Sequence, residues 1–444
     1  MNHRYFPHTE ADRREMLDAV GVRSIDDLFR AIPESCRMAK APDIPGPLSE
    51  WDLKRRIGAM AASGGGDWKV FVGAGSQPHH IPSVVPALAG RGEFVTSYTP
   101  YQPELSQGTL QAIFEFQTLV ARLAGLETAN ASMYDGATAM AEAALMAQRA
   151  TRRRNLAVSS LVHPHWRETL ATYLAPAEDA TPAALPALPD GRTDFSPLAG
   201  LREPAALLLQ SPNFFGVVED VAGAAEAIHR AGGLLAVGFS EPFAYGVLKS
   251  PGLLGADIAF GEGQSLGQAQ SFGGPGLGLM AARLEFVRQM PGRLVGQTVD
   301  NRGQRGFVLT LSTREQHIRR ARAVSNICSN AGHSALTAAI FMAAVGGSGF
   351  RKLSRINRDL AEYFKNGLVD KGFKSVFSAP TYNEFVLAAP AGFAETHARL
   401  REKRILLGLP LSGYYPDRPG EWLFGVTETS AREEIDAVLR EVRK

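Results

Sequence analysis

The sequence predicts an α/β protein with a mostly parallel sheet in a large domain, followed by a smaller C-terminal α/β domain. Short, continuously apolar segments at 206–210, 234–237 and 257–260 alternate with helix-like segments, a pattern typical of strands buried on both faces. A long helical region then precedes a second alternation of helices and strands after residue 350. These observations together favour a doubly covered sheet joined by a helix to a second unit.

Composition and charge narrow the class of protein. The 444 residues are 45% apolar and 21% charged, with a formal net charge of +2, so we expect neither nucleic acid nor a membrane as partner. Cys36 and Cys328 are too few and too far apart to predict a disulfide framework or a zinc site. The charged N-terminus and the short apolar stretch at 335–345 predict no signal peptide and no membrane span, which favours the cytoplasm.

The N-terminal part is expected to form a helical arm. Ser24 and Ser49 each precede an amphipathic segment and are predicted N-caps, and Pro33 is expected to end the first segment. This arm has too few apolar residues for a core of its own. The predicted organisation is a helical arm at residues 1–63, a large α/β domain at 64–330, and a linking helix with the small α/β domain at 331–444.

The large domain is predicted from alternating periodicities. The connection at 261–276 is too short for a helix, so the strand after it is expected to run antiparallel to its predecessor. The predicted helices lie at 104–124, 138–150, from about 165, and at 219–231, and the strands at 156–160, 206–210, 234–237, 257–260 and 277–281.

The C-terminal region is predicted to begin with a helical stretch over 313–344, broken by the glycines at 346–349. The remaining predicted elements are helices at 353–368, 395–403 and 431–443 and strands at 384–387 and 422–426.

Several local motifs are interpreted as structural. The turn 73–76 lacks the third glycine of a dinucleotide fingerprint and is followed by Pro78, so no dinucleotide site is predicted. His79 and His80 have no third ligand at a suitable spacing and are interpreted as an ordinary loop pair. The segment 163–165 is interpreted as a helix N-terminus. No metal site is predicted.

Residues 98–150 organise the large domain, and they begin with an aromatic turn. Tyr98 and Tyr101 flank Pro100, and Gln102 precedes Pro103. Proline makes such a turn rigid, and its aromatic side chains can either pack at a subunit interface or line a site.

The same stretch contains a helix start built from small residues. A turn of this kind lets backbone approach a ligand, and the free N–H groups of the helix attract anions. The segment can be a plain helix start or a phosphate cradle. Its residues are Asp135, Gly136, Ala137 and Thr138.

This layout is that of fold-type I pyridoxal-phosphate enzymes, whose chemistry requires a lysine, an acidic partner for the pyridine nitrogen and phosphate donors. Lys249 is the single lysine between Lys69 and Lys352, and it lies in a polar turn. The segment 261–267, where the lysine belongs, has none, and Glu241 lies several residues beyond a strand end. We therefore assign no catalytic and no cofactor-binding residue.

Residues 98–143 resemble the signature of the glycine cleavage system P-protein family, as found in the N-terminal (alpha) subunit of its two-subunit form. The loop 73–80 and the stretch 329–333 depart from the family pattern. Further similar segments are 20–29, 210–216, 256–258, 261–264, 291–296, 306–309, 314–319, 325–328, 382–386 and 426–428.

The resemblance implies a subunit that has lost its cofactor lysine, while a beta subunit holds pyridoxal phosphate. The two subunits are expected to form a heterodimer that pairs into a heterotetramer, to decarboxylate glycine, and to pass the aminomethyl group to the lipoyl arm of the H-protein. The T-protein and L-protein complete the system. Under this interpretation Asp135–Thr138 is a vestigial, phosphate-loop-like helix start, and Tyr98, Tyr101 and Gln102 face the partner's site. The alternatives are a non-catalytic aminotransferase-like scaffold subunit and a stand-alone lyase that uses Lys249.

Overall fold

The computed structural model describes residues 5, 7–38, 40, 42–64, 68–176 and 181–442. The chain divides into two compact units, Met1–Gly66 and Asp67–Lys444. The second unit contains the sheets and all sites discussed below. The assignment of residues 1–63, 64–330 and 331–444 to three parts stays a prediction.

The first unit consists of short helices. Ser24 and Ser49 are confirmed as N-caps, since their hydroxyls accept hydrogen bonds from the backbone N–H groups of Asp27 and Asp52. None of the described residues in its helices is buried within the unit, so apolar side chains such as Trp51 remain exposed. Its elements are α1 (Glu10–Val20), η1 (Ile25–Phe29), η2 (Glu34–Cys36) and α2 (Glu50–Ser63).

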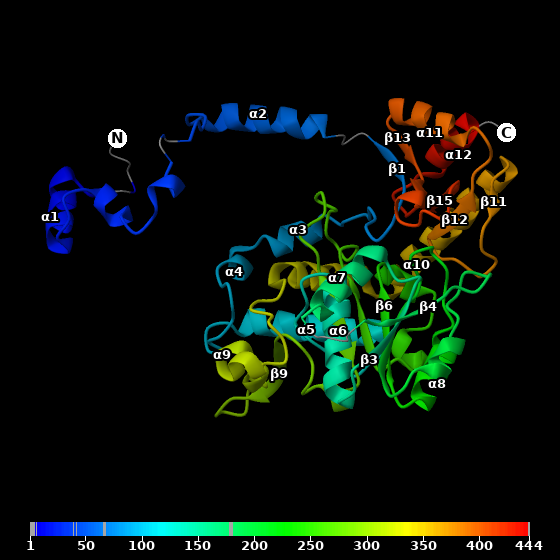
Figure 1. Cartoon of the computed structure of the whole chain (residues 1–444), viewed down its shortest axis with the longest axis horizontal. Helices are drawn as coiled ribbons and strands as arrows, with labels where there is room; N and C mark the ends of the chain where they lie inside the picture. Colours follow the sequence, from blue (N-terminus) through cyan, green and yellow to red (C-terminus); the bar gives the residue numbers. More distant parts are fainter. Residues whose placement is uncertain are drawn as a thin grey trace. The chain divides into compact units, whose positions relative to one another are not determined.

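A seven-stranded sheet forms the centre of the second unit (Figure 1). Five neighbouring strands are parallel, and β8 runs antiparallel to β7, as predicted from the short connection. In spatial order the strands are β2 (Thr128–Ala129), β8 (Gly278–Ala282), β7 (Ile258–Glu262), β6 (Leu234–Phe239), β5 (Pro204–Gln210), β3 (Asn155–Ser159) and β4 (Ala183–Leu185).

Helices cover both faces of this sheet. Leu208 and its same-face neighbours pack with α6 (Gly136–Thr151) and α7 (Pro164–Leu174), whereas Leu207 faces α8 (Val221–Arg230). The alternation follows from the period of two along a strand. Because both faces are covered, every position of β5 is buried, and all but the terminal Gln210 are apolar. Towards the other end of the sheet, α5 (Gln107–Ala124) packs on the face opposite α6.

A hairpin that the sequence interpretation missed lies beside α5. Strands β9 (Leu294–Val299) and β10 (Arg305–Thr310) pair antiparallel. Gln107 and Gln117 of α5 bind its backbone: each side-chain carbonyl accepts from a strand N–H, Phe307 and Val295 respectively, at 2.9 Å. The glycines at 296, 303 and 306 obscured the strand pattern. The hairpin fixes Arg293, which contributes to the site described below.

The predicted helix over 313–344 is wrong in its first half. Residues 311–331 form only short pieces, η7 (Ser312–Arg314), α9 (Gln316–Arg319) and η8 (Arg320–Arg322). The cause is local: the Arg314 guanidinium turns inward to bond the carbonyls of Met290, Gly292 and Leu311. Arg320 also has a φ of 52°, which a continuing helix does not allow.

The long helix α10 spans Gly332–Asp370 and is kinked at Gly346, where φ is 64° and ψ is 170°. The kink confirms the interruption expected from the glycines at 346–349, although the helix resumes at once. Among the described helices, α10 alone is long and apolar enough to cross a bilayer. Within its most apolar window 39% is buried, and Phe341, Ala335 and Ala338 are among the side chains that pack in the core shared with α5 and the sheet.

The C-terminal region forms a smaller α/β unit on α10, where Phe364, Phe385 and Phe424 share a core (Figure 1). The predicted strands at 384–387 and 422–426 are confirmed. The sheet order is β11 (Lys374–Ser375), β12 (Glu384–Ala388), β15 (Glu421–Gly425) and β14 (Leu409–Pro410), with β1 (Lys69–Phe71) paired to β13 (Ile405–Leu407) and with helices α11 (Phe393–Glu402) and α12 (Arg432–Glu441). Two further helices, α3 (Val84–Ala89) and α4 (Gly92–Val95), lead to the aromatic turn.

Candidate functional site

The predicted helix start at 135–138 forms the N-terminus of α6. Asp135 is its N-cap: its carboxylate accepts from the Thr138 N–H at 2.7 Å, and the Thr138 hydroxyl accepts from the Asp135 N–H at 3.3 Å. This reciprocal capping box stabilises the first turn. Gly136 must lack a side chain, because a Cβ there would lie 2.5 Å from Trp166. The segment is therefore a close-fitting helix start, and its phosphate-loop role stays a prediction.

A carboxylate of the chain itself lies in this helix start. Glu262, the last residue of β7, accepts a hydrogen bond from the Gly136 N–H at 3.0 Å through Oε2. Its Oε1 accepts from the N–H groups of Gln264 and Leu277 at 3.0 and 2.9 Å. Burial of the carboxyl group raises the pKa of Glu262 to about 7, despite these bonds, which lower it. Sequence reasoning missed this contact, although ligand-binding groups often follow the carboxyl ends of parallel strands.

The residues near the positions expected for a cofactor-binding acid and lysine, Glu241 and Ser265, bind each other, and Glu241 also binds His79. Ser265, in the segment where a lysine belongs, is buried and donates to Glu241 Oε2 at 2.9 Å. Glu241 in turn contacts His79, whose Nε2 lies 2.9 Å from the same carboxylate. Glu241 thus has a cationic partner in His79 and a hydroxyl donor in Ser265.

His79 is the centre of a buried charged cluster. Its Nδ1 lies 3.0 Å from Glu428 Oε2, so the imidazole bridges Glu428 and Glu241. Burial alone lowers the pKa of His79, but the two carboxylates outweigh this effect and raise it to about 10. The imidazolium therefore ties the loop after β1 to the central sheet and to the C-terminal unit. His79 is not the ordinary loop residue that the sequence suggested, whereas His80 is exposed.

The other histidine motif is confirmed as structural. The His163 side chain caps α7, accepting from the His165 N–H at 3.2 Å, and its Nε2 lies 3.0 Å from the Ala74 carbonyl. Burial lowers the pKa of His163 to about 4, so the ring is neutral at pH 7. Among the described residues no group of three or more His, Cys, Asp and Glu side chains is placed to hold a metal ion.

The aromatic turn is exposed, unlike these clusters. Tyr98 and Tyr101 are 88% and 60% exposed, and Gln102 is exposed as well. The Tyr98 hydroxyl lies 3.1 Å from Ser329 Oγ. The Tyr101 hydroxyl accepts from Arg293 Nη2 at 3.2 Å, and the guanidinium lies 5.4 Å from its ring centre. The rings are thus held from behind while much of their surface faces solvent.

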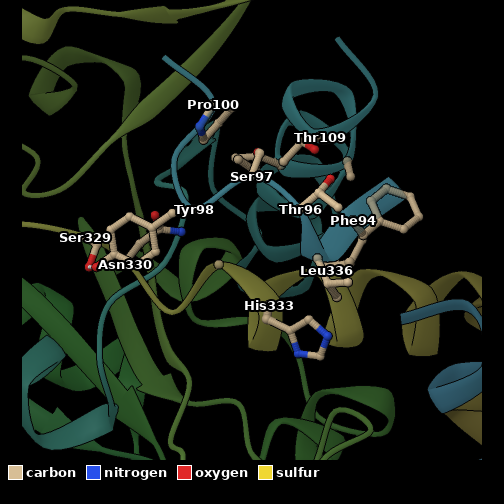
Figure 2. A pocket seen from close by; sticks show the side chains of 14 residues that line it. Phe94, Thr96, Ser97, Tyr98, Pro100, Thr109, Ser329, Asn330, His333 and Leu336 are labelled. Atoms are coloured by element: carbon tan, nitrogen blue, oxygen red, sulfur yellow. Dashed lines mark hydrogen bonds between the residues drawn. The ribbon is translucent and has the colours of Figure 1, made fainter. Parts of the chain in front are cut away.

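Behind the turn lies a pocket of about 480 Å³. Figure 2 shows Tyr98 beside Ser329 and Asn330, with His333 and Leu336 on the adjoining turn of α10. No side chain caps the N-terminus of α10. The remaining lining comes from the segment leading into the turn and from α5, and it includes Phe94, Thr96, Pro100, Thr109 and Ile113.

The segment 328–330 connects the two predicted regions. The Cys328 N–H donates to the Tyr134 hydroxyl at 3.2 Å, next to the α6 helix start. Asn330 Nδ2 donates to the Ala131 carbonyl at 3.0 Å. Ser329 contacts the aromatic turn, so one short segment touches both. The sequence did not predict a role for residues 328–330, although they overlap and follow the segment 325–328, which is similar to the family pattern.

The fold identifies the structural class to which the protein belongs. A crystal structure of alanine–glyoxylate aminotransferase from Nostoc sp. matches with a TM-score of 0.57 at 16% identity, covering 84% of this chain and 94% of that one. The chain therefore has the fold of type I pyridoxal-phosphate enzymes, as predicted. The residues at the predicted cofactor positions do not fit that cofactor, because Glu262 accepts from the α6 helix start, His79 contacts Glu241, and a serine, Ser265, lies in the segment where a lysine is expected.

The family model described as glycine cleavage system P-protein matches residues 3–442. A probable glycine dehydrogenase (decarboxylating) subunit 1 from Desulfotalea psychrophila is 52% identical over 99% of this chain and 98% of its own length. A crystal structure of glycine decarboxylase (P-protein) of the glycine cleavage system, in inhibitor-bound form, matches with a TM-score of 0.89 at 44% identity, covering 100% of this chain and 99% of that one. The chain belongs to the glycine cleavage system P-protein family.

Proposed function

We propose that the chain is the alpha subunit of a glycine decarboxylase. Together with a beta subunit it decarboxylates glycine and passes the aminomethyl group to the lipoyl group of H-protein, in the cytoplasm, alongside T-protein and L-protein. The observation that carries this proposal is the full-length match to the glycine decarboxylase structure, at 44% identity over 100% of the chain.

Pyridoxal phosphate is held by the beta subunit in this proposal. The cofactor supplies an electron sink for decarboxylation when bound. Support comes from the chain's own contacts, because Glu262 and His79 already satisfy the groups that a cofactor would need, and no lysine lies between Lys249 and Lys352. Alpha and beta subunits form a heterodimer, and two heterodimers form a heterotetramer.

The aromatic turn is the part of this chain that reaches the partner's site. Its exposure supports this role, and so does the fixed orientation of Tyr101, whose hydroxyl is held by the buried Arg293. Tyr98, Tyr101 and Gln102 bind and orient substrate or exclude water there. Held side chains of this kind pre-organise a site at low entropic cost.

Glycine-dependent exchange of the carboxyl carbon with labelled bicarbonate tests the proposal in the purified two-subunit complex. Tyr98→Ala and Tyr101→Ala are each expected to reduce exchange at least about tenfold, equivalent to about 1.4 kcal/mol, while the complex still assembles. Leu253→Ala, at a side chain that is 73% exposed, is the control and leaves exchange unchanged. Normal exchange in both tyrosine variants would favour the non-catalytic scaffold.

A spectroscopic measurement tests where the cofactor is held. The isolated chain incubated with pyridoxal phosphate is expected to show no absorbance of a lysine-bound cofactor, whereas the complex shows it. If the isolated chain shows this absorbance, and borohydride removes it while fixing the cofactor to a lysine, the proposal of a cofactor-free subunit is contradicted.

A further inference from the structure

Helix α6 carries a buried carboxylate that lacks a partner. Glu142 is 2% exposed, and its Oε2 atom has no hydrogen-bond partner within the part of the chain that the structure describes. Buried carboxylates are normally paired or hydrogen-bonded, because an isolated charge is costly to bury. Burial raises the pKa of Glu142 to about 7, and the positive charge of Arg149 opposes this effect. The folded chain therefore leaves this acid poorly stabilised in its ionised form.

Glu142 lines a pocket of about 410 Å³ that α6, α7 and the segment 316–326 form together. Glu142, Leu145 and Arg149 follow one another at spacings of three and four residues, so they lie on one stripe of α6, and all three line the pocket. Tyr173 of α7 and Val324 belong to the lining as well. A cavity of this size with a few converging polar groups is typical of small-molecule sites.

The base of this stripe also lacks a partner for one of its donors. Arg149 Nη2 donates to the Gln289 carbonyl at 3.1 Å, whereas Nε is buried and makes no hydrogen bond to the described residues. Desolvation lowers the pKa of Arg149, but a guanidinium stays charged at pH 7. Arg320, which is exposed, lines the same pocket. An acid, an apolar side chain and a base thus succeed one another along the pocket wall.

The two charged groups of the stripe do not satisfy each other. Seven residues separate Glu142 from Arg149, which places their Cα atoms about 10 Å apart along the helix. The guanidinium is bound to the Gln289 carbonyl, while Glu142 Oε2 and Arg149 Nε both stay unpaired in the described ranges. A direct ion pair would have used these atoms, so their open valences are available to a molecule in the pocket.

We propose that this pocket binds a small zwitterion of the amino-acid class, whose ammonium group donates to Glu142 and whose carboxylate accepts from Arg149. Leu145 and Val324 then contact the apolar side chain of the ligand. Glu142 repels a simple anion, and the arginines repel a simple amine, so a ligand that carries both charges satisfies both groups. An ammonium group beside Glu142 also favours the ionised carboxylate. The inference does not depend on the proposed function.

The test is isothermal titration calorimetry of the full chain with L-leucine, which is not the substrate of the proposed reaction. Two analogues keep its branched carbon skeleton: isocaproate lacks the ammonium group, and isoamylamine lacks the carboxylate. Wild type is expected to bind L-leucine, and to bind each analogue at least about tenfold more weakly, because each leaves one buried charged group without its partner. This comparison requires no variant.

Two variants assign the two halves of the ligand to their residues. Glu142→Gln is expected to weaken L-leucine at least about tenfold and to leave isocaproate unchanged, since isocaproate has no ammonium group to lose. Arg149→Met is expected to weaken L-leucine and isocaproate alike and to leave isoamylamine unchanged. Glu226→Gln, at an exposed carboxylate of α8 outside the pocket, is the matched control and binds L-leucine as wild type does. Circular dichroism checks that each variant is folded.

Three results would each overturn the inference: no binding of L-leucine to wild type, an analogue that binds as tightly as L-leucine, or unchanged binding of L-leucine to Glu142→Gln. If Glu142→Gln does not fold, Arg149→Met and the comparison of the three compounds on wild type decide. A ligand site predicts the paired losses in the two variants, whereas a purely structural role of Glu142 predicts a change in stability without any difference among the three compounds.

Discussion

The α6 helix start, predicted to be a vestigial phosphate-loop-like segment, and the aromatic turn before α5, predicted to face a partner's site, belong to one stretch but differ in burial and in their contacts. At the helix start, Glu262 accepts from the N–H groups of Gly136, Gln264 and Leu277. The polar groups around His79 are likewise buried and paired. In the turn, Tyr98 and Tyr101 expose most of their surface while their hydroxyls are held by Ser329 and Arg293.

This difference separates a buried region whose polar groups are paired within the chain from an exposed region whose rings face solvent. Buried polar groups at the end of the sheet need partners, and here the Glu262 and Glu241 carboxylates and the His79 imidazolium provide them. The exposed turn has no such requirement, and its side chains remain free for a neighbour. Substitutions in the cluster should therefore alter stability, and substitutions in the turn should alter activity.

The largest expected effect comes from His79→Leu. It removes the cation between Glu241 and Glu428 and leaves two buried carboxylates unpaired, which costs about 3–5 kcal/mol of unfolding free energy. Denaturant unfolding of the full chain measures it. His80→Ala, at the exposed neighbour, is the control and should stay within about 0.5 kcal/mol of wild type. A small effect of His79→Leu on the unfolding free energy would contradict the expectation that the buried cluster around His79 stabilises the fold.

The pH dependence of the unfolding free energy tests whether His79 is charged in the folded chain. His79 has a pKa of about 10 in the folded chain and about 6.5 when unfolded. Its contribution is therefore complete below pH 6.5 and is lost as the pH rises towards 10. The stability difference between wild type and His79→Leu should shrink by a few kcal/mol over this interval, as measured by unfolding at several pH values. A constant difference would show that the imidazole is neutral in the folded state.

The parts of the fold that sequence reasoning recovered are those set by local periodicity. The apolar segments at 206–210 and 234–237 became β5 and β6, and Ser24 and Ser49 became N-caps, because a strand run or a cap depends on adjacent residues. The long helix was placed too early, since Arg314 turns inward to bond distant carbonyls, a contact that periodicity does not encode.

The candidate site was less predictable because its contacts join distant positions. His79 meets residues 162 and 349 positions away, and no local pattern distinguishes it from His80. Glu262 was not predicted as a site residue because its segment was expected to supply a lysine. Its position at the end of a buried strand nevertheless indicates that it lies near the site. The aromatic turn could be singled out because a rigid cluster of tyrosine and proline is recognisable without tertiary contacts, and its site role stays a prediction.

A milder change at the turn is Tyr101→Phe, which removes only the hydroxyl that Arg293 holds. A hydrogen bond to a charged group contributes about 1.5–3 kcal/mol when buried, and the exposure of Tyr101 places the stability loss nearer 1 kcal/mol. Exchange of the glycine carboxyl carbon should fall more than stability does, because the ring is no longer oriented. Ser329→Ala, which releases Tyr98 instead, provides a comparison. A loss of stability without any change in exchange would assign the turn to packing.

The smallest effect is expected at Lys249, and it bears on the stand-alone lyase. Lys249 is exposed in the segment between η4 (Pro242–Gly246) and η5 (Pro251–Leu254), and surface substitutions of this kind change stability by less than about 0.5 kcal/mol. Lys249→Ala in the two-subunit complex should leave both exchange and the cofactor absorbance unchanged. Loss of that absorbance would place the cofactor amine in this chain.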